Sequence, residues 1–149
     1  MIKRTLQALT LTAAALVALA VRPSDARAQE HAALVWRQLN TAFETVSRDG
    51  FGSVNYIIGR MGEGKSDSWT LNFEKGVNYK IVGACDKDCS DVDIEVIDGS
   101  ETIARDVLAD DAPIVSFSPK TSGQLRIKVT MVKCSDEPCF FGFGLFQKS

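Results

Sequence analysis

From residue 54 to the end of the sequence, apolar and polar residues alternate in short runs, and this period of two most constrains the fold. The alternation is clear over residues 54–58, 69–73, 91–97 and 125–131, and residues 79–84, 101–105, 114–118 and 140–146 are further short segments that we interpret as strands. Turn-forming residues, chiefly glycine, proline, aspartate and serine, separate them. Because successive side chains of a strand point to opposite faces, each run predicts a strand with one buried face. We therefore expect residues 51–149 to form a mainly β domain, a jelly-roll-like β-sandwich of about seven or eight strands.

The core of this sandwich should consist of the apolar residues on one face of each strand. The expected members are Leu71, Phe73, Ile81, Val92, Ile94, Val96, Ile114, Leu125, Ile127, Val129 and Phe143. No internal repeat or linker interrupts the pattern, so one core should serve the whole domain.

A different period precedes the strands. Apolar residues recur there every three or four positions, at Ala32, Val35, Trp36, Leu39, Ala42, Phe43 and Val46. This spacing predicts an amphipathic helix over residues 29–50, which Gly50 can end in the left-handed conformation. We expect the helix to dock on the sandwich through Trp36, Leu39 and Phe43, because an isolated helix of this length is marginal in water. A contact with a second copy or with a partner protein is the alternative.

The first 28 residues have the features of a bacterial secretory signal peptide. Lys3 and Arg4 precede an uncharged, largely apolar run at residues 6–21, and Ala26-Arg27-Ala28 supplies the small residues that signal peptidase recognises. Residues 1–28 should therefore be removed by cleavage before Gln29, which makes the mature protein periplasmic or secreted. An uncleaved membrane anchor is the alternative, but the run is shorter than the about 20 residues that a membrane span needs.

Four cysteines lie in the mature part of the chain, in two close pairs. They are Cys85, Cys89, Cys134 and Cys139. An even number of cysteines in a small exported domain indicates disulfides. Each pair brackets a short polar turn between two strand runs, so we expect a Cys85–Cys89 and a Cys134–Cys139 bond that fix two hairpins at one end of the sandwich. A four-cysteine zinc site is the alternative, although its pairs are usually separated by two residues, and these are separated by three and four.

Several short motifs follow one another in a recognisable order. Ser68-Trp69-Thr70-Leu71 leads to Gly76 and Tyr79, and then come Asp91-Val92-Asp93-Ile94, Pro113-Ile114-Val115 and Thr121-Ser122-Gly123. Over residues 53–149 this order resembles the bacterial pre-peptidase C-terminal domain, a β-sandwich often attached to secreted proteases. Two features differ from that family, since Gln124-Leu125 stands where many members have an aromatic residue and no peptidase accompanies the domain. The resemblance implies a sandwich fold with a binding or assisting role, and it implies no reaction.

Two features that suggest nucleotide binding or catalysis have simpler explanations. Residues 59–66 match the phosphate-loop pattern G-x4-G-K-[ST], but a strand run follows them in place of the required helix. They predict a glycine-rich hairpin and no nucleotide site. His31 is the single histidine, and its position near the mature N-terminus predicts a solvated surface residue. The sequence therefore offers no base for a Ser-His-Asp or Cys-His arrangement.

Carboxylates form the remaining cluster of functional interest. Asp91, Asp93 and Glu95 share one strand face, and a nearby acidic loop could approach them. Because calcium prefers several carboxylate oxygens, the sequence suggests a calcium site. Its candidate ligands are Asp91, Asp93, Asp110 and Asp111. The alternative is a solvated acidic face opposite Arg126 and Lys128 on a neighbouring strand.

These observations predict an exported accessory protein that binds an unknown envelope or secreted protein and is not an enzyme. Removing residues 1–28 takes the net charge from −2 to −5, because the segment carries four basic residues and one acidic residue. An acidic domain is a poor partner for nucleic acid. A carboxylate- or metal-dependent hydrolase is one alternative, and it would require acidic residues that converge in a cleft. A structural subunit of a cell-envelope complex is another, and it would require an exposed apolar stripe on the helix.

Overall fold

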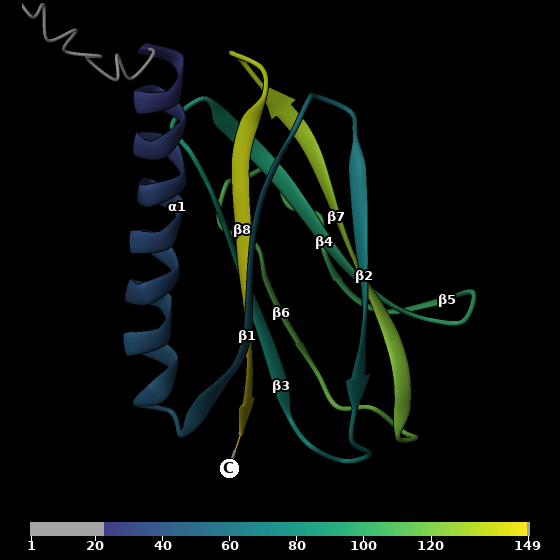
Figure 1. Ribbon diagram of the computed structural model, residues 1–149. Helices are drawn as coiled ribbons and strands as arrows, with labels where there is room; N and C mark the ends of the chain where they lie inside the picture. The colour runs from purple at the N-terminus through teal and green to yellow at the C-terminus, as the bar shows by residue number, and fades with distance from the viewer. Residues whose placement is uncertain (1–22, 149) are drawn as a thin grey trace, which may run out of the picture.

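The computed structural model describes residues 23–148, which form one helix and eight strands in two antiparallel sheets (Figure 1). The elements are α1 (Pro23–Ser47), β1 (Phe51–Met61), β2 (Ser66–Phe73), β3 (Tyr79–Cys85), β4 (Cys89–Asp98), β5 (Glu101–Asp106), β6 (Ile114–Phe117), β7 (Gly123–Cys134) and β8 (Cys139–Lys148). Sheet A has the strand order β1-β8-β3-β6, and sheet B has the order β2-β7-β4-β5. This is the order of an eight-stranded jelly roll. The predicted β-sandwich is confirmed, and each predicted run falls on one strand.

The helix α1 lies along the outer face of sheet A (Figure 1). It begins at Pro23 rather than at the predicted residue 29, and Asp25 occupies its first turn, where a negative charge is favourable. Gly50 follows its end with a left-handed φ of 82°. Most of the predicted signal peptide, residues 1–22, lies outside the described residues. Within residues 23–148 no helix is both long and apolar enough to cross a membrane.

The predicted docking of the helix on its own sandwich is confirmed, and Trp36, Leu39 and Phe43 all make the predicted contacts, although Trp36 is only partly covered. Val35 and Leu39 are fully buried against sheet A, and Phe43 is partly buried and stacks on Phe146. Trp36 remains 44% exposed and packs edge-on against Tyr56. The reason is geometric: positions four residues apart on a helix share a face, so burying Val35 and Leu39 turns Trp36 to the border of that face.

The main core lies between the two sheets and follows the predicted alternation. The confirmed buried members are Phe73, Ile81, Val92, Ile94, Val96, Leu125, Ile127, Val129 and Phe143. Leu71 is only partly buried, and the prediction for Ile114 is wrong, because this residue is 55% exposed. In the short edge strand β6 the inward position belongs to Val115, one residue later. A shift of one residue moves a side chain to the opposite face of a strand.

Both disulfides join one sheet to the other. The first links Cys85 at the end of β3 in sheet A to Cys89 at the start of β4 in sheet B, with the Cα atoms 5.9 Å apart. The second links Cys134 at the end of β7 in sheet B to Cys139 at the start of β8 in sheet A, at 5.8 Å. The predicted pairing is confirmed, but the predicted hairpins are wrong, because each turn crosses between the sheets.

The phosphate-loop pattern is a third crossing of the same kind. Residues 62–65 connect β1 in sheet A to β2 in sheet B, so the predicted hairpin is wrong there as well, while the predicted strand after it is confirmed. Strand register places all three crossings at one end of the sandwich, since Met61 pairs with Cys139 and Cys89 pairs with Cys134. We call residues 62–65, 86–88 and 135–138 the disulfide end.

Replacing Cys134 and Cys139 together with alanine is expected to lower the free energy of unfolding by about 2 kcal/mol. The bond closes a loop of only a few residues, so it restricts the unfolded chain modestly. Urea unfolding measures the change, with Ser90→Ala at an exposed position as the control. A non-reducing peptide map that joins the Cys85 region to the Cys134 region would contradict the local pairing.

Candidate functional site

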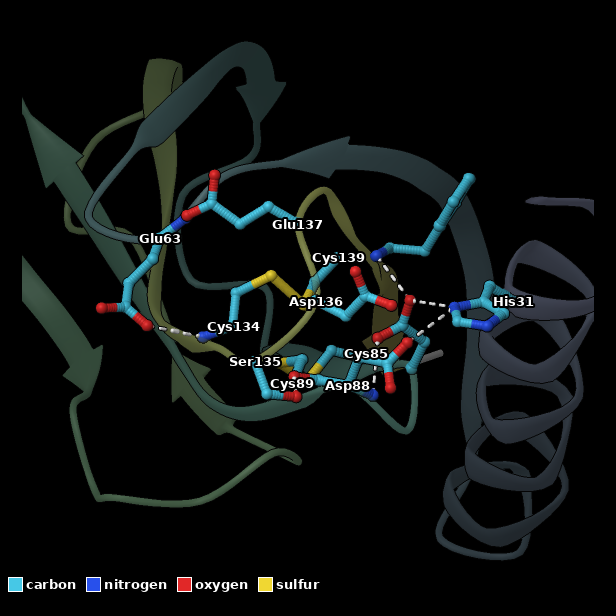
Figure 2. The surroundings of a disulfide bond; sticks show 12 residues. His31, Glu63, Cys85, Asp88, Cys89, Cys134, Ser135, Asp136, Glu137 and Cys139 are labelled. Carbon is cyan, nitrogen blue, oxygen red and sulfur yellow. Dashed lines mark hydrogen bonds and ion pairs between the residues drawn. A yellow bond between two sulfur atoms is a disulfide. The ribbon is translucent and has the colours of Figure 1, made fainter. Parts of the chain in front are cut away.

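Hydrogen bonds tie the three turns of the disulfide end to one another (Figure 2). The N–H of Cys134 donates to Glu63 Oε2 at 3.0 Å, and the N–H of Glu63 donates to Glu137 Oε1 at 2.9 Å. Ser135 donates both its N–H and its hydroxyl to the carbonyl of Asp88, at 2.8 and 2.9 Å. Together with the two disulfides, these bonds connect the three turns into one continuous network at the end of the sandwich.

A buried carboxylate, Asp86, connects this surface to α1. The residue is 1% exposed, and its Oδ2 atom lies 2.8 Å from His31 Nδ1. The same oxygen accepts the N–H of Phe140 at 2.8 Å, and Oδ1 accepts the N–H of Asp88 at 3.1 Å. A buried carboxylate needs such partners, because desolvation of an unpaired charge is costly. Asp86 thus joins the helix, the first disulfide turn and the start of β8.

The prediction that His31 is a solvated surface residue is wrong, because the residue is only 5% exposed. His31 precedes Val35 by four positions and Leu39 by eight, so it lies on the buried face of α1. Its Nε2 atom is buried and has no hydrogen-bond partner among the described residues. The helical periodicity, extended one turn toward the N-terminus, was the signal that could have predicted its burial.

His31, Asp86 and Asp88 form a cluster with the composition of a metal site. One ligand atom from each lies within 4.8 Å of the others, and Asp88 Oδ2 is 3.6 Å from His31 Nδ1. Sequence reasoning missed this cluster, since it requires the helix to contact a turn more than 50 positions away. Imidazole nitrogen combined with carboxylate oxygen suits divalent transition metals.

A pocket of about 300 Å³ opens beside this cluster. Its lining residues are Ser24, Arg27, Ala28, His31, Arg60, Asp88, Asp136, Glu137, Pro138 and Phe140. Within it, Arg27 lies 2.6 Å from Asp136 Oδ2 and 3.5 Å from Asp88 Oδ2. Ser24, Arg27 and Ala28 precede the predicted cleavage before Gln29, so processing there would widen the pocket and leave its acidic side chains without Arg27.

Among the described residues, the side chains close enough together to hold one metal ion are those of His31, Asp86 and Asp88. The four candidate calcium ligands do not come together in this way. Asp91 is buried with an unpartnered Oδ1, whereas Asp110 accepts the N–H of Ala112 within its own loop. The loop does reach β4, because the N–H of Val92 donates to the carbonyl of Asp110 at 3.0 Å. Calcium binding at Asp91, Asp93, Asp110 and Asp111 stays a prediction, checked by the melting temperature with about 1 mM calcium.

The outer face of sheet B carries the remaining acidic side chains. Lys128 lies opposite Glu95 in the strand register and its Nζ is 2.8 Å from Glu95 Oε2, so this part of the alternative solvated-face interpretation is confirmed. Arg126 lies opposite Ile97 instead. The pKa of Asp93 is raised above its ordinary value, first by partial burial and then by the neighbouring carboxylates of Asp91, Glu95 and Asp106.

Replacing Asp93 with asparagine is expected to raise the melting temperature at pH 7. A raised pKa means that the folded protein binds the proton more tightly than the unfolded chain does. The stability from protonated Asp93 is therefore present below pH 3.8 and is lost as the pH rises through the folded pKa. The difference in melting temperature between the Asp93→Asn variant and the wild-type protein should therefore shrink as the pH falls toward about 3.5. Thermal unfolding in EDTA measures it, with exposed Asp98→Asn as the control, and a lower melting temperature at pH 7 would contradict the expectation.

Comparison with known proteins supports the fold but assigns no family. No family model matches the sequence, and no curated protein matches it. Eight chains of solved structures match. One is the crystal structure of PliG from Aeromonas hydrophila, a periplasmic lysozyme inhibitor of g-type lysozyme, with a TM-score of 0.50 and 14% sequence identity over 63% of this chain and 85% of that chain. This likeness to the structure of an inhibitor shows a shared fold.

Proposed function

We propose that this protein is an exported, non-enzymatic binding protein that recognises a protein partner in the periplasm or secreted space through its disulfide end. The observation that carries the proposal is that hydrogen bonds of Glu63, Ser135 and Glu137 tie three turns together, and that a disulfide closes each of two of these turns. A surface held rigid before binding loses little conformational entropy when a partner docks. The fold shared with a periplasmic inhibitor supports the same role.

The position of the single histidine argues against a serine or cysteine hydrolase, and the carboxylate- or metal-dependent hydrolase stays the second candidate because His31, Asp86 and Asp88 have the composition of a metal site. His31 is buried in the joint between α1 and the sandwich and faces Asp86, so it is not available as a surface base for a serine or cysteine nucleophile. All four cysteines are in disulfides. The alternative of a structural envelope subunit loses its main support as well, because the apolar face of α1 is occupied by sheet A.

The resemblance to the pre-peptidase C-terminal domain fits this role. That family joins a β-sandwich to secreted enzymes. We propose that this sandwich is a member of the same group, with two disulfides and a docked helix as additions to the shared fold.

A photo-reactive amino acid placed at two exposed lysine positions tests the location of the binding surface. Lys87 lies in the disulfide end, and Lys120 lies at the opposite end of the sandwich beyond β6. Irradiation of cells that export each variant should give a defined protein adduct from position 87 and none from position 120. Adducts from position 120 alone would place the binding surface elsewhere, and no adduct from either would contradict a protein partner.

A g-type lysozyme is the first purified partner to test, because a matching structure is that of its inhibitor. We expect the protein to reduce the lytic activity of this enzyme and Lys87→Glu to weaken the effect at least about tenfold, as a reversed charge at an interface does. Lys120→Glu reverses the same charge at an exposed position and should have no effect. If the protein leaves the lytic activity of the lysozyme unchanged, this enzyme is not the partner. The proposal of a protein partner at the disulfide end is then tested by the photo-cross-link at position 87.

A further inference from the structure

The predicted cleavage places His31 in a special position. It would make Gln29, Glu30 and His31 the first three residues of the mature chain. A free α-amino group, the next two backbone amides and an imidazole at the third residue can form three fused chelate rings around one ion. Four nitrogens in one plane are the arrangement that copper(II) and nickel(II) prefer.

The structure shows which backbone groups the cleavage would release. In α1 each N–H is directed at the carbonyl four residues earlier, so the amides of Glu30 and His31 are directed at residues 26 and 27. Both acceptors belong to the segment that is removed. The first N–H groups of a helix lack internal partners. The amides required for chelation are therefore freed by the same event that creates the α-amino group.

The surroundings favour a cation once the segment has left. Arg27, which contacts Asp136 and Asp88, is removed with it. His31 Nδ1 remains 2.8 Å from Asp86 Oδ2 and 3.6 Å from Asp88 Oδ2. The negative charges of these carboxylates favour a cation at the imidazole. If an ion replaces Asp86 as the partner of His31 Nδ1, the Asp86 carboxylate still accepts the N–H of Phe140.

We propose that the mature protein binds one copper(II) ion at its N-terminus. The ligands are the α-amino nitrogen of Gln29, the amide nitrogens of Glu30 and His31, and Nδ1 of His31. The carboxylates of Asp86 and Asp88 lie beside the ion. Binding releases one proton from the α-ammonium group and one from each amide, so it strengthens as the pH rises. The proton that His31 Nδ1 donates to Asp86 moves to Nε2 when Nδ1 binds the ion, so the imidazole stays neutral. The first turn of the mature helix must unwind so that its amide nitrogens can bind the ion. This turn unwinds readily because no earlier helical turn contacts it.

A single inserted glycine provides the matched control. The full chain is exported with its own leader, once as it stands and once with glycine between Ala28 and Gln29. The insertion moves His31 to the fourth position and breaks the fused rings, while every side chain of the site is retained. Equal melting temperatures of the two proteins without copper show that the fold is unchanged. Intact mass gives the first residue and shows whether the terminal glutamine has a free amine.

Titration with copper(II) chloride then decides the proposal. We expect the mature protein to take up one equivalent with the electron paramagnetic resonance pattern of four nitrogen ligands, and the glycine variant to lose that pattern. The same pattern in both proteins would overturn the proposal, as would a mature protein that takes up no copper in this form. A chain that starts at another residue, or one blocked at Gln29, would overturn it too. Neither result bears on the protein partner at Lys87, which is tested separately.

Discussion

Replacing Asp86 with alanine is expected to lower the free energy of unfolding by about 3 kcal/mol or more. Three groups lose their acceptor at once: His31 Nδ1, the N–H of Phe140 and the N–H of Asp88. Each buried donor left without a partner costs about 1–3 kcal/mol. The carboxylate joins α1 to the disulfide end, so its loss weakens the attachment of the helix as well as the turn.

Urea unfolding followed by tryptophan fluorescence measures this change, and two further variants separate its causes. Asp86→Asn keeps one acceptor oxygen and loses the charge, so a smaller loss is expected. Asp136→Ala removes an exposed carboxylate in the same part of the molecule and should change stability by less than about 0.5 kcal/mol. A loss for Asp86→Ala as small as that of Asp136→Ala would show that the buried network contributes nothing to stability.

Replacing Ile94 with alanine is expected to cost about 2–5 kcal/mol, the usual range for a large aliphatic side chain truncated in a core. Ile94 is 1% exposed and lies on β4, an inner strand of sheet B. Its Cδ1 atom faces Gly83 of β3, where a Cβ would approach it to 3.0 Å. The two sheets are in close contact at this point, so the surrounding chain has little room to fill the cavity.

Glu95→Ala is the matched control, one residue along the same strand. Glu95 points to the outer face and pairs with Lys128, and a pair of this kind contributes at most about 1 kcal/mol. Thermal unfolding of the two variants should therefore give a large and a small shift. Equal shifts would mean that β4 does not present Ile94 to the core in this register.

The strands could be predicted from the sequence because alternation is a local property. Val92, Ile94 and Val96 mark β4 without any knowledge of its neighbours. Ile114 fails because β6 is only four residues long, and so short a run does not fix which of two adjacent apolar residues faces inward. Trp36 makes its predicted contact with the sandwich but stays 44% exposed, since an apolar residue at the border of a helical stripe is buried only as far as the partner surface extends.

The candidate site could not be predicted because it depends on contacts between distant segments. The sequence indicated the disulfide pairs but not that each pair crosses between sheets, since the strand order that decides this is set by long-range pairing. His31 and Asp86 are separated by 55 positions. The local sequence around either residue does not predict their contact. The burial of His31 alone could have been predicted, because its helical spacing with Val35 and Leu39 places it on the buried face.

The closeness of the paired cysteines along the chain has a consequence for how the protein matures. Four cysteines allow three pairings. Here the partners are four and five positions apart, and the first pair is complete well before the second begins. Short loops close with the least loss of entropy. In a chain that crosses a membrane from its N-terminus, Cys85 meets Cys89 before Cys134 has emerged. The native bonds can therefore form in the order of translocation, without an isomerase to correct wrong ones.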